Sequence, residues 1–177
     1  QRTSANTNDL RGKILRIRPT VNGSYTIPEG NLFPKGTAKT RPEIYVMGCR
    51  NPYRISIDQK SNYLYWGKVG PDAGSDSSRG PRGYDEINQA RKAGNFGWPY
   101  FSADNKPYSD YNSAEKKIGK TFNLEKPINT SVNNTGLTQL PPAQPAFWHY
   151  PRASACAGPV FHADLFPENQ GGLPAQL

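Results

Sequence analysis

The chain has 177 residues, and 34% of them are apolar, with 17 glycines and 17 prolines. This length is typical of one domain, so we expect residues 1–177 to form a single domain rich in short strands and turns. Lys and Arg outnumber Asp and Glu by 22 to 14, which gives a net charge of +8 and favours anionic partners. Because the basic residues are scattered, the sequence does not indicate a nucleic-acid-binding protein.

Neither a membrane span nor a cysteine framework is indicated. No apolar run approaches the roughly 18 residues of a membrane-spanning helix. The first residues include neither Met nor the apolar core of a signal peptide, so we expect an internal or processed piece of a longer protein. Cys49 and Cys156 lie far apart and lack CxxC spacing, which predicts free thiols rather than a zinc site or a disulfide framework.

The first half of the chain predicts a run of short strands. Residues 12–17 (GKILRI) alternate apolar and polar side chains, and a long polar loop with a tight turn at Asn22 and Gly23 follows. Three further strands are predicted at residues 43–48, 53–58 and 62–70. The polar connection between the last two is typical of a hairpin, so the segment predicts a β-meander.

The second half is less regular. Residues 70–83 are rich in Gly, Ser and Asp and predict a loop. Residues 85–94 (DEINQARKAG) could be scored as a helix by propensity, but Pro99 in the following segment favours a strand that leads into a turn at Gly94 and Asn95. The remaining predictions are a polar loop at residues 102–140, a strand pair at residues 145–151 and 157–162, and an irregular tail at residues 163–177.

Short strands with Gly and aromatic punctuation are typical of sandwiches, barrels and propeller blades. A propeller blade takes about 40–50 residues, and a closed ring takes about 4–8 blades. If the chain is propeller-like, it therefore holds two to four blades' worth of sequence and is part of a ring.

Four stretches carry a resemblance to a known family: GKILRI, GCRNPYR, VGPDAGSD…GYDEIN and KAGNFGWPYF, in this order. Together they resemble the soluble quinoprotein sugar dehydrogenases, which use pyrroloquinoline quinone (PQQ) and calcium. The resemblance implies an all-β fold, namely part of a six-bladed β-propeller built from four-stranded antiparallel sheets with long loops. It also implies a periplasmic or extracellular protein that acts on a small sugar and passes electrons to a separate acceptor.

The resemblance implies that Arg50 and Asn51 contact the cofactor. PQQ is a planar tricarboxylate, and the fork-shaped guanidinium and the amide are suited to bind its oxygens. A guanidinium beside the quinone would stabilise the negative charge that develops on reduction. The alternative is that Arg50 forms a structural ion pair with Asp85 or Glu86. No role is assigned to Arg54.

The resemblance also implies metal ligands. The backbone oxygens of Gly70 and Pro71 match those that bind the calcium next to the cofactor, and Glu86 matches a residue that helps to hold a second, structural calcium in some members. Calcium takes six to eight oxygens and commonly mixes carboxylates with backbone carbonyls. Three more carboxylates are possible ligands by type alone, although an acidic surface loop without a metal is an equal alternative: Asp72, Asp76 and Asp85.

No catalytic residue is predicted within this chain. The family's general base is a histidine on an earlier blade, and neither His149 nor His162 lies in the matching context. For Trp66, Trp98 and Trp148 we favour core packing over stacking on a sugar. Two functions remain open: part of an enzyme that oxidises aldoses to lactones, and a non-catalytic propeller-derived module that binds carbohydrate or protein.

Overall fold

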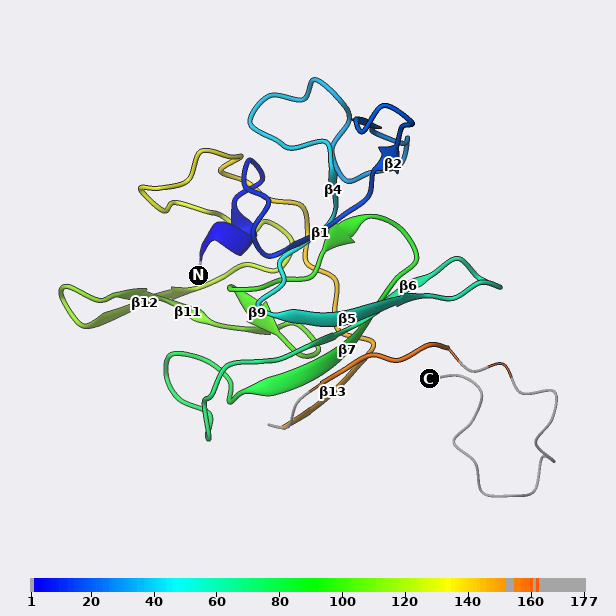
Figure 1. Cartoon of the computed structure of the whole chain (residues 1–177). Coiled ribbons are helices and arrows are strands. Elements are labelled where there is room, and N and C mark those ends of the chain that lie inside the picture. Colours follow the sequence, from blue (N-terminus) through cyan, green and yellow to red (C-terminus); the bar gives the residue numbers. More distant parts are fainter. Residues whose placement is uncertain (1, 152–154, 161, 163–177) are drawn as a thin grey trace, which may run out of the picture.

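The computed structural model describes residues 2–151, 155–160 and 162, and nearly all of their regular structure is β (Figure 1). The described part has one short 3-10 helix, η1 (Arg2–Ala5), so the all-β prediction is confirmed. None of the described residues belongs to a helix that is long and apolar enough to cross a bilayer. The strands are β1 (Lys13–Leu15), β2 (Arg18–Pro19), β3 (Tyr25–Thr26), β4 (Ile44–Met47), β5 (Pro52–Ile57), β6 (Leu64–Lys68), β7 (Tyr84–Ala90), β8 (Gly94–Asn95), β9 (Phe101–Ser102), β10 (Lys106–Pro107), β11 (Ser109–Asn112), β12 (Lys117–Thr121) and β13 (Trp148–Pro151).

The largest sheet has four antiparallel strands in the order β13-β7-β6-β5 (Figure 1). The predicted hairpin of residues 53–58 and 62–70 is confirmed as β5 and β6. The predicted meander is wrong in its first strand, because residues 43–48 contain β4, which lies in another sheet, and β7 is the neighbour of β6 here. A four-stranded antiparallel sheet of this kind is the unit of a propeller blade. The facing pairs on its buried side change from apolar to ionic along the strands: Leu64 with Ala90, Trp66 with Asn88, and Lys68 with Glu86.

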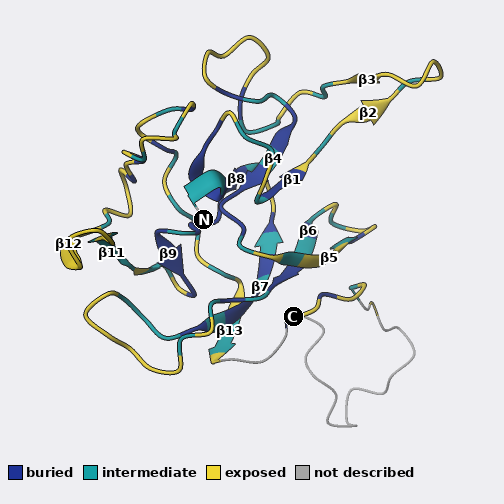
Figure 2. Ribbon diagram, turned by 60° about the vertical axis from the view of Figure 1, so that its left-hand side comes forward, coloured by how far each residue is buried: buried dark blue, intermediate teal, exposed yellow. Residues whose placement is uncertain are grey.

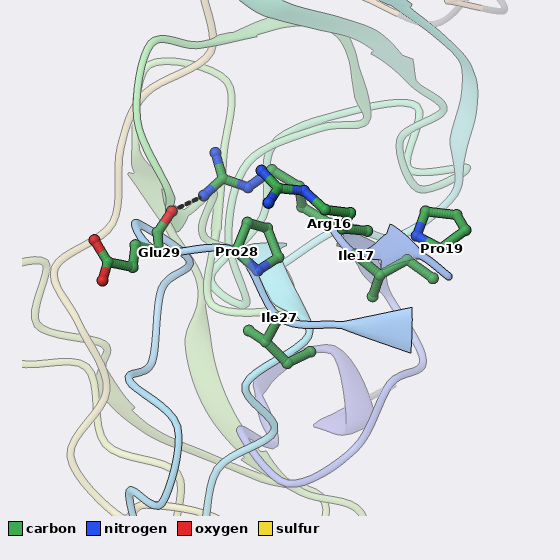
Figure 3. Close-up of a pocket in the computed structure, with 7 residues that line it drawn as sticks. Arg16, Ile17, Pro19, Ile27, Pro28 and Glu29 are labelled. Carbon is green, nitrogen blue, oxygen red and sulfur yellow. Dashed lines mark hydrogen bonds between the residues drawn. The ribbon is translucent and has the colours of Figure 1, made fainter. Parts of the chain in front are cut away.

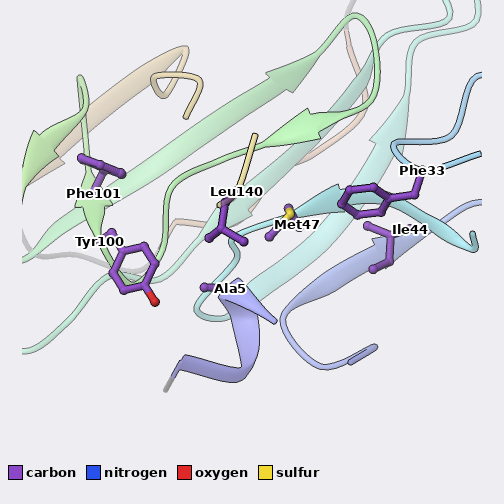
Figure 4. Packing of buried hydrophobic residues seen from close by; sticks show 7 residues of the cluster. All are labelled: Ala5, Phe33, Ile44, Met47, Tyr100, Phe101 and Leu140. Atoms are coloured by element: carbon purple, nitrogen blue, oxygen red, sulfur yellow. The ribbon is translucent and has the colours of Figure 1, made fainter. Parts of the chain in front are cut away.

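A smaller sheet in the order β1-β4-β8 packs against the main hydrophobic cluster. Ile44 and Met47 of β4 meet Tyr100 and Leu140 in this cluster, and the small side chain of Ala5 packs among them (Figure 4). Burial of these apolar side chains fixes β4 and therefore also the turn that follows it.

Three further predictions differ from the structure. The turn predicted at Gly94 and Asn95 is wrong, because these residues form β8 and pair in parallel with β4. Residues 102–140 are not all loop, since β9–β10 and β11–β12 are antiparallel pairs. Residues 145–151 contribute β13, but it pairs with β7 and not with residues 157–162, whose described members form no strand. The predicted tail at residues 163–177 lies outside the described residues.

The tight turn predicted in the first long loop is confirmed. Gly23 has φ of 78°, in the left-handed region, and its N–H donates to Thr20 O. The turn joins β2 to β3, and this hairpin is exposed, as is β12, whereas β9 is buried (Figure 2).

Candidate functional site

The turn that carries Arg50 and Asn51 follows β4 directly. It begins at Gly48, where φ is 77° and a Cβ atom would lie 2.6 Å from the backbone nitrogen of Gly97. Only glycine fits such a position without a shift of the neighbouring chain. Arg50 is partly buried and Asn51 is exposed, while Pro52 begins β5.

The structure brings the two predicted binding motifs together. Arg50 Nη1 donates a hydrogen bond of 3.1 Å to the carbonyl oxygen of Val69, and Val69 N donates to the carbonyl oxygen of Asn51 at 3.1 Å. The next residue, Gly70, donates its backbone N–H to Asp85 Oδ1 at 2.6 Å. Arg50, Asn51 and the backbone at residues 69–70 thus form one connected unit, which we call the Arg50–Gly70 junction.

Gly70 and Pro71 lie against the start of β7 without room for a side chain. A Cβ atom on Gly70 would lie 1.9 Å from Tyr84 O, and one on Gly83 would lie 1.8 Å from Pro71 O. Both distances are far below van der Waals contact, so a side chain at either position would clash with backbone. The two segments can pack this closely only because both positions are glycine. The close approach fixes where the carbonyl groups of residues 70 and 71 lie.

Glu86, predicted as a metal ligand, is surrounded by hydrogen-bond donors. Its Oε2 lies 2.7 Å from Lys68 Nζ and accepts from Asn88 Nδ2 at 3.1 Å. Its Oε1 accepts from Ser102 Oγ at 3.2 Å and from Ala103 N at 2.8 Å. Because a metal ion needs oxygen ligands, the ammonium and the two N–H donors at this carboxylate do not fit a metal site at Glu86.

The other candidate carboxylates differ in their surroundings. Asp72 and Asp76 are exposed, and Asp76 Oδ1 accepts from Arg82 N at 2.8 Å. Asp85 is buried and accepts from Gly70 N. Within the described ranges, no three His, Cys, Asp or Glu side chains gather as a metal-binding group. The ion pair considered for Arg50 with Glu86 is replaced by the pair of Glu86 with Lys68.

A cavity of about 470 Å³ adjoins the Arg50–Gly70 junction. Pro71 and Trp98 line it, and the Arg50 guanidinium lies over the Trp98 ring, 5.9 Å from its centroid. Arg79 also lines the cavity, with its guanidinium 3.8 Å from the centroid of the Tyr111 ring. Further aromatic side chains complete the wall, namely Tyr100, Tyr108 and Phe122.

Burial raises the pKa of Tyr100 and of Tyr108 to about 12, so both phenols keep their proton at neutral pH. Both phenol O–H groups are buried and have no hydrogen-bond partner of normal geometry among the described residues, so these two tyrosines support the wall of the cavity from behind. Sequence reasoning missed Tyr108 because it treated residues 102–140 as a loop, and it assigned no role to Tyr100 in the stretch KAGNFGWPYF. The feature of the sequence that could have indicated both tyrosines is the high density of aromatic residues in residues 98–111, WPYFSADNKPYSDY.

A second hollow, of about 840 Å³, lies at the base of the β2–β3 hairpin and is drawn in Figure 3. Arg16, one of its two arginines, is held by the surrounding chain: Nε donates to Asn31 Oδ1 at 2.8 Å, and Nη2 donates to Glu29 O. None of the predicted site residues lines this hollow.

The tryptophans and cysteines have different surroundings. Trp66 is fully buried and contacts Phe96 edge-on at 4.7 Å between ring centroids, as core packing predicts. Trp98 is also buried but borders the cavity. The packing prediction is wrong for Trp148, which is 57% exposed because the outer strand β13 turns it towards solvent. Both cysteines are free, as predicted: Cys49 (buried) and Cys156 (exposed).

Each histidine lies near a carboxylate. His149 lies with its Nε2 3.9 Å from Asp104 Oδ1, and its ring meets that of Tyr84 edge-on. His162 Nε2 lies 2.5 Å from Asp58 Oδ1, and bonds from Ser61 and His162 lower the pKa of this carboxyl. Neither histidine lines the cavity beside the junction.

The chain is similar in sequence to known proteins over most of its length. The family model described as glucose / sorbosone dehydrogenase matches residues 1–170. The chain is 30% identical to the HIPL2 protein of Arabidopsis thaliana over 131 residues. This match covers 64% of this chain and 17% of that protein. It is 32% identical over 126 residues to aldose sugar dehydrogenase YliI of Escherichia coli, covering 71% of this chain and 30% of that protein.

Two further comparisons complete these findings. Quinoprotein glucose dehydrogenase B of Acinetobacter calcoaceticus is 32% identical over 110 residues, which are 60% of this chain and 19% of that protein. The crystal structure of the soluble aldose sugar dehydrogenase from Escherichia coli in the apo form covers 83% of this chain and 32% of that chain, with 26% identity and a TM-score of 0.46. This chain spans less than a third of each of these relatives. Since the family model matches residues 1–170, the chain belongs to the glucose/sorbosone dehydrogenase family.

Proposed function

We propose that this chain is part of a quinoprotein sugar dehydrogenase, a six-bladed propeller that oxidises aldoses to lactones with PQQ and calcium. The observation that carries the proposal is the Arg50–Gly70 junction, in which the two predicted binding motifs are hydrogen-bonded to each other. Membership of the family and the names of two relatives, an aldose sugar dehydrogenase and a quinoprotein glucose dehydrogenase, support it.

In this proposal Arg50 and Asn51 bind the cofactor. A guanidinium has five N–H donors, and the bond to Val69 uses one, so the geometry is compatible with a bidentate bond to a carboxylate. The bond to Val69 and the contact with Trp98 orient the guanidinium before any ligand binds. Bound PQQ would supply the two-electron acceptor of the reaction. A positive charge held beside it would stabilise the reduced form.

Gly70 and Pro71 would hold calcium through their backbone carbonyl oxygens, which are the hard ligands that this ion prefers. The hydrogen bond from Gly70 N to Asp85 and the close packing on Tyr84 and Gly83 hold this backbone in place. Glu86 is left out of the calcium site because of its contacts with Lys68 and the other donors.

The rest of the proposal concerns the whole protein. The substrate is a small aldose, the electrons pass to a separate acceptor, and the protein works in the periplasm or outside the cell. The general base that removes a proton from the sugar hydroxyl is assigned to no residue of this chain.

A non-catalytic carbohydrate-binding module is the second candidate, and the aromatic cavity of about 470 Å³ favours it. Aromatic side chains suit the apolar faces of sugars, and the Arg79 guanidinium in the lining can donate to their hydroxyls. The two functions differ in whether PQQ binds.

The test is a titration of the purified protein with PQQ in the presence of calcium, followed through the absorption of the quinone. Circular dichroism on the same sample reports whether the protein is folded. The proposed enzyme predicts saturable binding that is lost when calcium is chelated. Sugar binding by a folded protein that does not bind PQQ would support the module instead.

A further inference from the structure

The buried ion pair between Lys68 and Glu86 is the most completely enclosed charged feature of the described residues. The two side chains are only 1% and 2% exposed, and Nζ lies 2.7 Å from Oε2. They face each other directly in the β6–β7 register. Removing two charges from water is costly, so a buried charge needs an opposite charge close by. The partner of Nζ among the described residues is Glu86, at ion-pair distance and without a hydrogen bond of normal geometry.

The carboxylate has a full set of partners besides the ammonium. Ser102 Oγ and Ala103 N donate to Oε1 at 3.2 and 2.8 Å, and Asn88 Nδ2 donates to Oε2 at 3.1 Å. These donors come from β7 and from the segment of β9, so the carboxylate joins separate parts of the fold. An ionised carboxylate only accepts hydrogen bonds, and every neighbour named here donates one or carries a positive charge.

A divalent cation at this carboxylate would need oxygen ligands where the ammonium and the N–H donors now lie. Calcium takes six to eight oxygen ligands at about 2.3–2.6 Å. The Lys68 ammonium already lies at hydrogen-bonding distance from Glu86, where a cation would have to bind. A second positive charge beside it would be repelled in an environment that water does not screen.

We propose that the Lys68 ammonium is a built-in counter-cation for Glu86, so that this position is held by the protein's own charge and takes no calcium. Lys68 and Glu86 are positioning residues in this arrangement. Lys68 precedes Val69, whose backbone bonds to Arg50 and Asn51, and Glu86 follows Asp85, which accepts from Gly70. The pair thereby anchors both sides of the Arg50–Gly70 junction, whether or not a quinone binds there.

The buried thiol of Cys49 lies close enough to feel both charges of the Lys68–Glu86 pair. Burial raises the pKa of Cys49 to about 12; the positive charge of Lys68 lowers this pKa and the negative charge of Glu86 raises it. Cys49 precedes Arg50, so both charges of the pair act on the turn that carries the predicted cofactor residues.

The test counts calcium ions in the wild type and in Glu86→Gln by isothermal titration calorimetry. The proposal predicts the same number of binding events, with affinities within about twofold, because Glu86 is not a ligand. It also predicts that the melting temperature of Glu86→Gln is lower by about 10 °C, by the same amount in calcium and in chelator. Loss of one calcium-binding event in Glu86→Gln would overturn the proposal.

A double variant, Lys68→Met with Glu86→Gln, keeps the test decisive if the single variant does not fold. Removing both charges leaves no unpaired buried ion, so the double variant should melt above Glu86→Gln and bind as many calcium ions as the wild type. A double variant that is no more stable than Glu86→Gln, or that loses a calcium-binding event, would overturn the proposal.

The matched control is Lys106→Met, which removes a lysine from an exposed pair with Asp104. It should shift the melting temperature by less than about 2 °C.

The inference and the proposed function can fail separately. Absence of PQQ binding together with an unchanged number of calcium-binding events would contradict the proposed function and leave this inference standing.

Discussion

Arg50 and Val69 are joined by a hydrogen bond of 3.1 Å between a guanidinium nitrogen and a backbone carbonyl oxygen. The bond ties the turn after β4 to the end of β6, and the backbone bond from Val69 to Asn51 reinforces it. Two segments that are 19 residues apart therefore form one rigid corner. A ligand that binds at this corner can contact an arginine side chain and the Gly70–Pro71 backbone at once.

Arg54 should be replaceable by glycine without loss of stability. It lies at a bulge in β5 with φ of 57°, a conformation that costs an L residue about 1 kcal/mol relative to glycine. We expect Arg54→Gly to change the free energy of unfolding by between about 0 and +1 kcal/mol in urea denaturation. Arg54→Val should lower it by more than about 1 kcal/mol, because a β-branched residue is least suited to this conformation. Equal stability of the two variants would contradict the assignment of a strained bulge.

Gly70 should tolerate no side chain. A Cβ atom would lie 1.9 Å from Tyr84 O, and because the contact is with backbone, no side-chain movement can relieve it. We expect Gly70→Ala to lower the free energy of unfolding by about 3 kcal/mol or to prevent folding. The control is Gly158→Ala, where a Cβ atom would meet nothing within 4 Å. Thermal unfolding of both variants checks this, and a Gly70→Ala protein as stable as the control would show that the close approach is absent.

Cys49 should make the protein less stable in alkaline solution. Burial raises the pKa of this thiol to about 12, from a usual value of 9.0. Above about pH 9 the unfolded chain loses the proton while the folded protein keeps it, so unfolding becomes more favourable as the pH rises. Relative to Cys49→Ala, the wild type should lose about 1 kcal/mol of unfolding free energy between pH 9 and 10. A difference that does not change with pH would contradict the burial of the thiol.

The two cysteines should also differ in reactivity. Cys156 is exposed and Cys49 is buried, so a thiol reagent at pH 8 should label one cysteine in the folded protein and both in denaturant. Fast labelling of both cysteines without denaturant would show that the turn at Arg50 opens.

The sequence predicted those strands that can be recognised from a short stretch of neighbouring residues. Alternating apolar residues identified β1, short apolar runs identified β4, β5 and β6, and the resemblance pointed to Arg50, Asn51 and Gly70 of the junction. The partner of β13 was not predictable in this way, because pairing with β7 depends on tertiary packing and not on the local pattern. The same holds for Lys68, which reads as an exposed polar residue in a strand until its register with Glu86 is known.

The candidate site was predicted through resemblance rather than through chemistry. Arg50 by itself is compatible with a structural ion pair, and only its neighbours in sequence indicated a cofactor. The aromatic cavity was not predicted, because its tyrosines come from segments whose composition is polar. The sequence also could not show that donors surround Glu86, since Ser102 and Ala103 approach it from another strand.

The most direct test of the account is the affinity for PQQ of the wild type, Arg50→Ala and Arg50→Lys in the presence of calcium. The control is Arg91→Ala, which removes an exposed guanidinium that contacts Tyr63 and Gln89 instead of the junction. Loss of a charged, fork-shaped donor should weaken binding about 10- to 100-fold in Arg50→Ala and less in Arg50→Lys, and Arg91→Ala should bind as the wild type does. Unchanged affinity in a folded Arg50→Ala protein would contradict the account and assign Arg50 to structure alone.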